Sequence, residues 1–351
     1  MKRLARALFA TVAVAAVLVG CSTGTADTVT TSAPPTAEAT TPAPEPTHER
    51  VTITIASLKG PTTMGLVKLM EDAKTGAGAQ DYAPTMYGAP DEIVPLLVQG
   101  KVDVALVPSN LAAVLYNQTK TEAGPALQIA AINVLGVLEI VENGDTIHSV
   151  ADLKGKTIYT TGKGTTPEFV LDYLLTKAGL DPATDVTLEY RAEATEVATL
   201  VTATPGAVAV LPQPYATVVT KQNPTVRSAL SMTDEWTKVS PAGSQLVTGV
   251  LVVRTAFAEE HPEALADFLA DYEASTQYTN DEPEAAGELI AAAGIVPAAP
   301  VATAAIPFCN VTYIAGDEMK AAVSAYLQVL FDAEPKSVGG SMPGDDFYYE
   351  P

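Results

Sequence analysis

Two short segments of this 351-residue chain carry the same set of side chains, and that set can bind an anion. Residues 59–63 read Lys-Gly-Pro-Thr-Thr, and residues 163–166 read Lys-Gly-Thr-Thr. Each segment falls where an expected strand gives way to an expected helix. The free amides at a helix start, flanked by hydroxyls and an ammonium group, attract negative charge. The pair therefore predicts one anionic ligand held from both sides.

Patterns that signal catalysis or metal binding are missing from the sequence. The chain has three histidines and no His-x-x-x-His, Cys-x-x-Cys or Gly-x-Gly-x-x-Gly motif. Residues 162–165 read Gly-Lys-Gly-Thr, but the spacing of a phosphate-binding loop is absent. We therefore expect no enzymatic activity, no metal and no cofactor.

The charge of the chain restricts its partners. It has 41 Asp and Glu against 20 Lys and Arg, for a formal net charge of −21. No basic excess is available to neutralise phosphates, so we expect no nucleic-acid partner. Residues 246–351 hold 17 of the acids against three bases, whereas residues 151–245 are nearly neutral. Because the acidic residues are concentrated in residues 246–351, the net charge does not predict a cationic ligand, and we expect an anionic or neutral one.

Residues 1–20 have the pattern of an export signal. Cationic residues precede an apolar or small-residue run over 8–19, which is too short to span a bilayer. The run ends in Leu-Val-Gly-Cys21, which resembles the cleavage box of bacterial lipoproteins. That resemblance implies lipidation of Cys21 and anchoring on the outer face of the cytoplasmic membrane, with a simple cleaved secretory signal as the alternative. Residues 21–50, rich in Thr, Pro and Ala, are expected to be a disordered tether.

The second cysteine is expected to be structural. Lipidation of Cys21 would leave Cys309 without a partner for a disulfide within one chain. Cys309 lies in the apolar sequence Pro-Phe-Cys-Asn-Val, with no histidine nearby in sequence. We expect a buried side chain that packs as a small hydrophobe.

From Val51 onward, short β-branched runs alternate with longer runs of helical period, which indicates α/β architecture. Residues 53–70 and 157–175 repeat one order of strand, turn and helix, and this repeat predicts two similar lobes. Further strands are expected at 86–87, 102–107, 129–140 (one or two strands), 186–190, 207–211 and 249–253. Further helices are expected at 90–99, after residues 108–110 through Tyr116, at 194–202, from Pro262 and at 317–331.

Three stretches carry a family resemblance. They are Gly-Lys-Val-Asp-Val-Ala at 100–105, Ser-Val-Ala-Asp-Leu-Lys-Gly-Lys-Thr at 149–157 and Arg-Thr-Ala-Phe-Ala-Glu-Glu-His-Pro-Glu at 254–263. With the export signal and the two expected lobes, the chain resembles the substrate-binding proteins of ABC transporters. It looks most like the nitrate, taurine and sulfonate branch, which includes binders of thiamine pyrimidine precursors. The likeness covers nearly all of residues 51–335.

The resemblance implies a two-lobed type II periplasmic-binding-protein fold with two hinge crossovers. Lobe one would comprise 51–145 and 246–351 and lobe two 146–245, with crossings near 142–149 and 240–248. The ligand would lie between the lobes, at the carboxyl ends of the strands. Hinge closure would present it to an ABC permease with its ATPase subunits. The receptor itself is expected to be a monomer.

The loops that follow the strands match the positions where the family contacts its ligand. The expected contacts are Lys59, Thr62, Thr63, Met64, Tyr87, Gly88, Ser109 and Asn110 from lobe one, and Thr165, Thr166, Gln213 and Tyr215 from lobe two.

The ligand class stays open between two alternatives. The Thr-rich helix starts favour a small organic anion such as a sulfonate or carboxylate. A heteroaromatic vitamin precursor such as a thiamine pyrimidine would instead stack on an aromatic ring, for which the candidates are Tyr87, Tyr159, Tyr215 and Trp236. A surface-anchored enzyme of the same fold is a minor alternative, but it would need a site rich in His and Cys. A surface scaffold would have no cleft.

Overall fold

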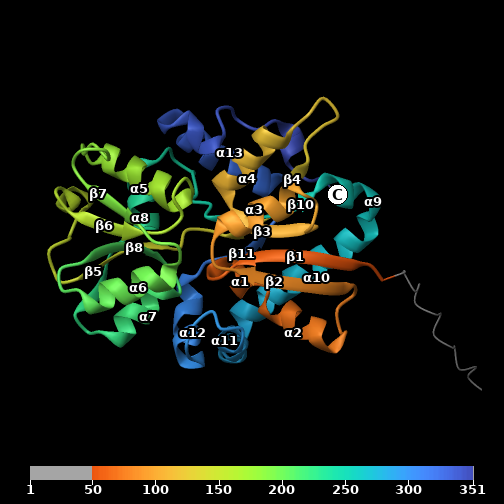
Figure 1. Cartoon of the computed structure of the whole chain (residues 1–351), viewed down its shortest axis with the longest axis horizontal. Coiled ribbons are helices and arrows are strands. Elements are labelled where there is room, and N and C mark those ends of the chain that lie inside the picture. Colours follow the sequence, from red (N-terminus) through yellow and green to blue (C-terminus); the bar gives the residue numbers. More distant parts are fainter. Residues whose placement is uncertain (1–49, 351) are drawn as a thin grey trace, which may run out of the picture. The chain divides into compact units, whose positions relative to one another are not determined.

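The computed structural model describes residues 50–350. The expected signal peptide, Cys21 and nearly all of the expected tether lie outside the described residues. The described chain forms two β-sheets, each covered by helices, and Figure 1 shows them side by side. We call each sheet with its helices a lobe.

The sheet of lobe one has six strands in the order β11-β4-β10-β3-β1-β2. Their bounds are β1 Thr52–Leu58, β2 Asp81–Tyr87, β3 Val104–Pro108, β4 Leu127–Val134, β10 Gly249–Arg254 and β11 Val311–Ile314. Strand β1 runs parallel to β2 and β3, so these three carboxyl ends meet at one edge. The return strand β10 is antiparallel to β3 and β4. Because helices cover both faces, β3 and β10 are almost continuously apolar and buried.

The sheet of lobe two has five strands in the order β7-β6-β8-β5-β9. Their bounds are β5 Leu138–Asn143, β6 Thr157–Thr160, β7 Thr187–Tyr190, β8 Val208–Pro212 and β9 Val226–Ser231. Strand β6 is parallel to β7 and β8, while β5 is antiparallel to β8 and β9. Lobe two thus repeats the three-strand parallel unit of lobe one, as the repeated sequence order predicts.

The helices follow the strands and fill the connections. Their bounds are α1 Pro61–Met64, α2 Val67–Thr75, α3 Pro90–Val98, α4 Ser109–Thr119, α5 Thr166–Lys177, α6 Ala194–Ala203, α7 Tyr215–Gln222, α8 Met232–Val239, α9 Thr255–Glu260, α10 Pro262–Asp281, α11 Pro283–Ala292, α12 Ala299–Ala305 and α13 Gly316–Ala333, with 3₁₀ turns η1 Val150–Leu153, η2 Ile306–Phe308, η3 Pro335–Val338 and η4 Asp345–Phe347. Helices α5–α8 cover lobe two, at the left of Figure 1.

The prediction of one helix over 63–70 is wrong in one respect: the helix is interrupted at Gly65 and Leu66, which separate α1 from α2. Helix α10 and strand β11 press against this point. A Cβ on Gly65 would lie only 2.9 Å from Thr276 Oγ1 and from Val311 Cγ1. That close approach favours glycine at position 65, which lies between the single turn of α1 and the start of α2.

The first crossing between the lobes comes earlier than the expected 142–149. Strand β5 already pairs with β8 and β9 of the second sheet, so the chain changes lobes at 135–137, directly after β4. The sheets therefore divide the chain before the expected boundary at 145. The other change of sheet falls between β9 and β10, a span that includes the expected 240–248.

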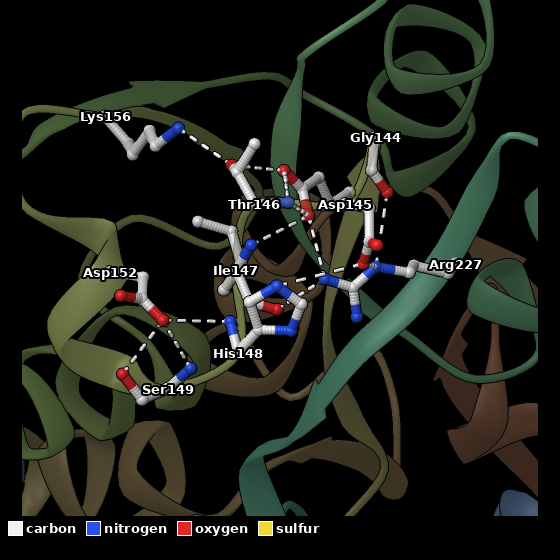
Figure 2. A network of polar contacts seen from close by, with 10 residues as sticks. Gly144, Asp145, Thr146, Ile147, His148, Ser149, Asp152, Lys156 and Arg227 are labelled. Carbon is white, nitrogen blue, oxygen red and sulfur yellow. Dashed lines mark hydrogen bonds and ion pairs between the residues drawn. The ribbon is translucent and has the colours of Figure 1, made fainter.

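Figure 2 shows why residues 142–149 form a loop of lobe two instead of a crossing. The carboxylate of Glu142, whose side chain is fully buried, accepts hydrogen bonds from the amides of Thr146 at 2.9 Å and Ile147 at 3.0 Å. Arg227 on β9 pairs with it at 3.1 Å. Burial raises the pKa of Glu142, but these hydrogen bonds and the positive charge outweigh burial and lower it overall. A buried anion thus folds the loop back onto its own strand.

The family-like stretches make contacts that hold the fold together. Asp103, from the first stretch, accepts hydrogen bonds from the amide of Thr54 at 2.9 Å and from its hydroxyl at 2.6 Å. Arg254, which begins the third stretch, pairs with Asp103 at 2.7 Å. In the second stretch, Asp152 accepts from the amides of His148 and Ser149 and closes a 3₁₀ turn. Each acid fixes a strand end or a loop.

Cys309 is buried, as the sequence predicts, and its thiol donates to the carbonyl oxygen of Ala305 at 3.2 Å. Burial raises the pKa of this thiol, which keeps it protonated. No helix between residues 50 and 350 has both the length and the apolar character that a membrane crossing requires.

Candidate ligand-binding site

A cavity of about 110 Å³ lies between the two lobes, where the carboxyl ends of their parallel strands face each other. We call it the cleft cavity. Leu58, Lys59, Pro61, Thr62, Gly88, Pro90, Pro108 and Thr248 line it from lobe one, and Leu138, Thr161, Gly162, Thr166, Pro167, Ala192, Ala194 and Pro212 line it from lobe two. The position agrees with the general preference of open α/β sheets for ligands at this edge.

A second, larger cavity of about 810 Å³ lies between α5, the end of α8 and the end of α13. Helix sides and one linker form its walls, and none of the parallel strand ends opens into it. We place the candidate site in the cleft cavity because both sheets direct their strand ends there.

Lys59 brings the positive charge of the site. It follows β1 directly, and its amide donates to the carbonyl oxygen of Tyr87 at 2.8 Å, which fixes the turn. Within residues 50–350 its ammonium group has no hydrogen-bond or ion-pair partner. Lys163, its counterpart in the repeat, lies over the ring of Tyr190 instead, with Nζ 5.5 Å from the ring centroid. Only one lysine of the repeated motif therefore lines the cleft cavity.

Two of the four threonine hydroxyls that line the cavity donate hydrogen bonds within the described residues. Thr62 Oγ1 donates to the carbonyl oxygen of Leu58 at 2.7 Å, and Thr166 Oγ1 donates to Asn110 Oδ1 at 3.2 Å. Thr248, which the sequence did not single out, also lines the cavity, and its Oγ1 is buried with no partner among the described residues.

The expectation of two matched anion-binding helix ends is wrong. Helix α1 has only four residues, so it has almost no dipole to offer. At the start of α5, Glu168 accepts a hydrogen bond from the amide of Gly164. At the start of α3, Glu92 accepts from the amides of Gly88 and Ala89, both at 3.1 Å. Carboxylates of the protein therefore bind the amide of Gly164 before α5 and those of Gly88 and Ala89 before α3.

Of the twelve expected contact residues, Lys59, Thr62, Gly88 and Thr166 line the cleft cavity. The other eight lie beside it or behind it. Thr63 and Ser109 are fully buried, and their hydroxyls donate to backbone carbonyl groups. Met64 packs in a buried cluster with α11 and α12. Thr165 Oγ1 turns back to the carbonyl oxygen of Gly162 at 2.6 Å.

Three more of the expected residues also lie outside the lining of the cleft cavity. Tyr87 packs partly buried against the core of lobe one. The Gln213 side chain accepts from the amide of Thr217 at 3.1 Å and lines a different cavity, next to Phe308. Tyr215 is buried, and its ring edge lies 3.5 Å from the position that a Cβ on Gly60 would take.

Asn110 joins the two lobes and is itself fully buried. Its Nδ2 donates to the carbonyl oxygen of Ser337 in lobe one at 2.9 Å and to that of Gly164 in lobe two at 3.3 Å. Its Oδ1 accepts from Thr166. All of its hydrogen-bonding atoms are engaged, and it does not line the cleft cavity.

None of the aromatic residues proposed for stacking lines the cleft cavity. Trp236 is fully buried between Tyr173 and Tyr326, with ring centroids 5.0 and 5.4 Å away. Tyr159 carries the guanidinium of Arg191 at 5.3 Å from its centroid. The walls hold five prolines instead.

The sequence could have indicated the missed lining residues. Pro108 and Pro212 are the last residues of β3 and β8, and Ala192 and Ala194 follow β7. Applying the rule of strand carboxyl ends to every expected strand would have included them. Only Thr248 and Leu138 carry no such signal, because they belong to antiparallel connections between the lobes.

Residues 50–350 contain no group of three or more side chains that could hold a metal ion.

A family model described as ABC transporter, phosphonate, periplasmic substrate-binding protein matches residues 77–302. The chain belongs to this family. The match confirms the expected class, an extracytoplasmic solute-binding component of an ABC importer, whose members deliver small solutes to a permease. The matching model is the phosphonate one, whereas the sequence motifs pointed to the nitrate and sulfonate branch. No curated protein sequence matches the chain.

Solved structures of similar fold include members of that branch. An ABC transporter protein from Parabacteroides distasonis is 23% identical, with a TM-score of 0.68 over 85% of this chain and 99% of that one. The aliphatic sulphonate binding protein SsuA of Escherichia coli is 18% identical, with a TM-score of 0.64 over 86% and 92%. The nitrate-binding protein NrtA of Synechocystis is 14% identical, with a TM-score of 0.61 over 83% and 84%. These likenesses confirm the two-lobed binding-protein fold.

Proposed function

We propose that this receptor captures a small organic oxyanion, such as a phosphonate, sulfonate or carboxylate, in the cleft cavity. The observation that carries the proposal is Lys59, which lines the cleft cavity at the strand ends and whose ammonium group has no hydrogen-bond or ion-pair partner within residues 50–350. An oxyanion would complete its hydrogen bonds. The family's phosphonate model and the similar fold of the sulphonate binder support the same ligand class.

The size of the cavity supports a ligand of few atoms. Its volume of about 110 Å³ is well below the roughly 300–1,000 Å³ of pockets for larger organic ligands. The proline and alanine walls suit a short apolar substituent. A heteroaromatic ring is less well supported, since no aromatic side chain lines the cavity.

The test compares two lysines that occupy the same place in the repeat. Thermal shift and isothermal titration calorimetry on the full chain would use alkyl phosphonates, alkyl sulfonates, nitrate, carboxylates and a thiamine pyrimidine. We expect at least one organic oxyanion to bind. Lys59→Met should weaken it by about 10- to 150-fold, the usual effect of losing a hydrogen bond to a charged group. Lys163→Met is the matched control and should bind as the wild type does.

Binding of the pyrimidine alone would favour the vitamin-precursor alternative. A flat response to every solute, with a correctly folded protein, would contradict the receptor proposal.

We also propose that the receptor is a monomer without enzymatic activity, tethered through lipid on Cys21 at the outer face of the cytoplasmic membrane. The cleavage-box pattern supports the lipid. Expression in a bacterial host should give a membrane-bound product whose mass includes acyl chains. Cys21→Ala should release the protein from the membrane fraction, and an unmodified wild-type mass would refute the anchor.

A further inference from the structure

The larger cavity, of about 810 Å³, lies away from the strand ends and has no role in the proposed function. We call it the helix cavity. Lobe two supplies α5, Pro182 and the end of α8, and lobe one supplies the end of α13, while residues 240–241 belong to the connection between the two sheets. The volume falls within the roughly 300–1,000 Å³ of pockets for small organic molecules, which often lie between such units.

One face of α5 forms a wall of the helix cavity. The side chains that line the cavity from α5 follow the helical period, and they are Phe169, Asp172, Tyr173, Thr176 and Lys177. The Tyr173 ring is buried against Trp236, with centroids 5.0 Å apart, and its hydroxyl donates to the carbonyl oxygen of Val239 at 3.1 Å. An aromatic ring is therefore fixed in this wall.

The remaining walls are mostly apolar. Their lining residues are Pro182, Val239, Ser240, Pro241, Val329, Leu330, Asp332, Ala333 and Glu334. The cavity thus has three carboxylates against one ammonium group, that of Lys177. Asp332 accepts a hydrogen bond from Gln328 Nε2 at 2.7 Å, and Glu334 accepts one from the amide of Lys336 at 3.2 Å. In the described part of the chain, neither acid forms an ion pair.

The carboxylate of Asp172 has no cationic partner among residues 50–350. Its Oδ1 is buried and has no hydrogen-bond partner there. The nearby Lys177 lies over the Tyr173 ring instead, with Nζ 5.2 Å from the centroid. Burial and the carboxylate of Glu168 raise the pKa of Asp172 to about 6, so its charge destabilises the fold at neutral pH. A bound cation would offset that cost.

From this cavity and its unpaired carboxylate we propose that the helix cavity is a second binding site, which takes an amphipathic organic cation. A protonated amine would pair with Asp172, and an apolar or aromatic body would pack against Tyr173 and Leu330. Residues 50–350 hold no group of three or more side chains for a metal ion, and the apolar walls suit an organic molecule better than a small hydrated ion. No residue lines both this cavity and the cleft cavity, so the inference does not rest on the proposed function.

The test uses three pairs of probes in which a hydroxyl replaces the ammonium group. These are hexylamine and hexanol, 2-phenylethylamine and 2-phenylethanol, and tryptamine and tryptophol. Calorimetry on the full chain at about pH 8, where Asp172 is charged, should show at least one amine that binds at least about tenfold tighter than its alcohol. Asp172→Asn removes the charge with little change of shape, and it should weaken that amine by about 10- to 150-fold.

Two variants are matched controls, and both should bind the amine as the wild type does. Asp181→Asn removes a carboxylate next to Pro182 that does not line the helix cavity. Its Oδ1 accepts a hydrogen bond from the amide of Ala183 at 2.9 Å, and an asparagine oxygen can still accept it. Lys59→Met alters the cleft cavity alone. Thermal unfolding verifies that each variant is folded.

Four results would overturn the inference. They are a folded wild type that binds no amine, equal binding of amine and alcohol, full affinity in Asp172→Asn, and an equal loss of affinity in either control variant. A loss in Lys59→Met would place the amine in the cleft cavity. Failure of every oxyanion to bind would refute the proposed function and leave this inference standing, because the two cavities share no lining residue.

Discussion

Asn110 should control how easily the two lobes close, although it does not touch the cleft cavity. Asn110→Ala removes two hydrogen bonds between the lobes, to Gly164 and from Thr166, and one within lobe one, to Ser337. Each buried hydrogen bond contributes about 0.5–1.5 kcal/mol, so the closed arrangement should lose about 1–3 kcal/mol relative to an open one. We expect ligand binding to select the closed arrangement, so apparent affinity should fall by about 5- to 150-fold.

Asn117 supplies a matched control on the same helix. Its Nδ2 donates to the carbonyl oxygens of Val338 and Ser341, both at 2.7 Å, so it anchors the same C-terminal segment without reaching lobe two. Asn117→Ala should lower the free energy of unfolding by a similar amount and leave ligand affinity unchanged. Urea unfolding, calorimetry with the bound oxyanion and small-angle X-ray scattering with and without it would measure all three effects.

Two results would refute this reasoning. One is an Asn110→Ala protein that binds as tightly as the wild type. The other is an equal loss of affinity in Asn117→Ala, which would mean that anchoring of the C-terminal segment, and not the contact between lobes, governs binding.

Three further changes have expected outcomes. Glu142→Ala should cost about 1–3 kcal/mol of unfolding free energy in urea because it leaves the buried amide of Ile147 without its acceptor, while Arg227 keeps Asp145 as a partner. Asp145→Ala, which removes that exposed partner, should cost under about 1 kcal/mol. Since the pKa of Glu142 is lowered, its contribution to stability is present above the unfolded pKa and is lost as pH falls through the lower folded pKa. Burial and the neighbouring carboxylate of Glu168 raise the pKa of Asp172 to about 6, so its charged form destabilises the folded protein at pH 7. Asp172→Asn should therefore raise the free energy of unfolding at pH 7 and change it little at pH 4. Equal effects at both pH values would contradict this. Gly88→Val should weaken oxyanion binding by placing a side chain against Glu193, and Glu193→Ala in the same chain should restore it if the contact between lobes is the cause.

The repeated strand, turn and helix order made the two-lobed fold predictable, since hydrophobic period and turn residues are local properties. Predictions from the local sequence pattern were wrong where segments that are distant in sequence come into contact. At Gly65, where the expected helix is interrupted, Thr276 and Val311 approach the chain although they lie more than 200 residues away in sequence. Lys59 and Lys163 are equivalent in sequence, yet one lines the cleft cavity and the other covers a tyrosine ring.

The sequence by itself determined the family resemblance, the α/β class and the expectation that a ligand binds at the carboxyl ends of the strands, because these follow from local periodicity and from short motifs. In the structure, those motifs make contacts within the protein. Asp103 accepts a hydrogen bond from Thr54 and pairs with Arg254, and Asp152 closes a turn by accepting a hydrogen bond from Ser149. Only the tertiary structure decided which residues line the cleft cavity. Glu193 and Gly88 lie more than 100 positions apart, and no local pattern encodes their approach, since it depends on how two separately folded sheets pack edge to edge.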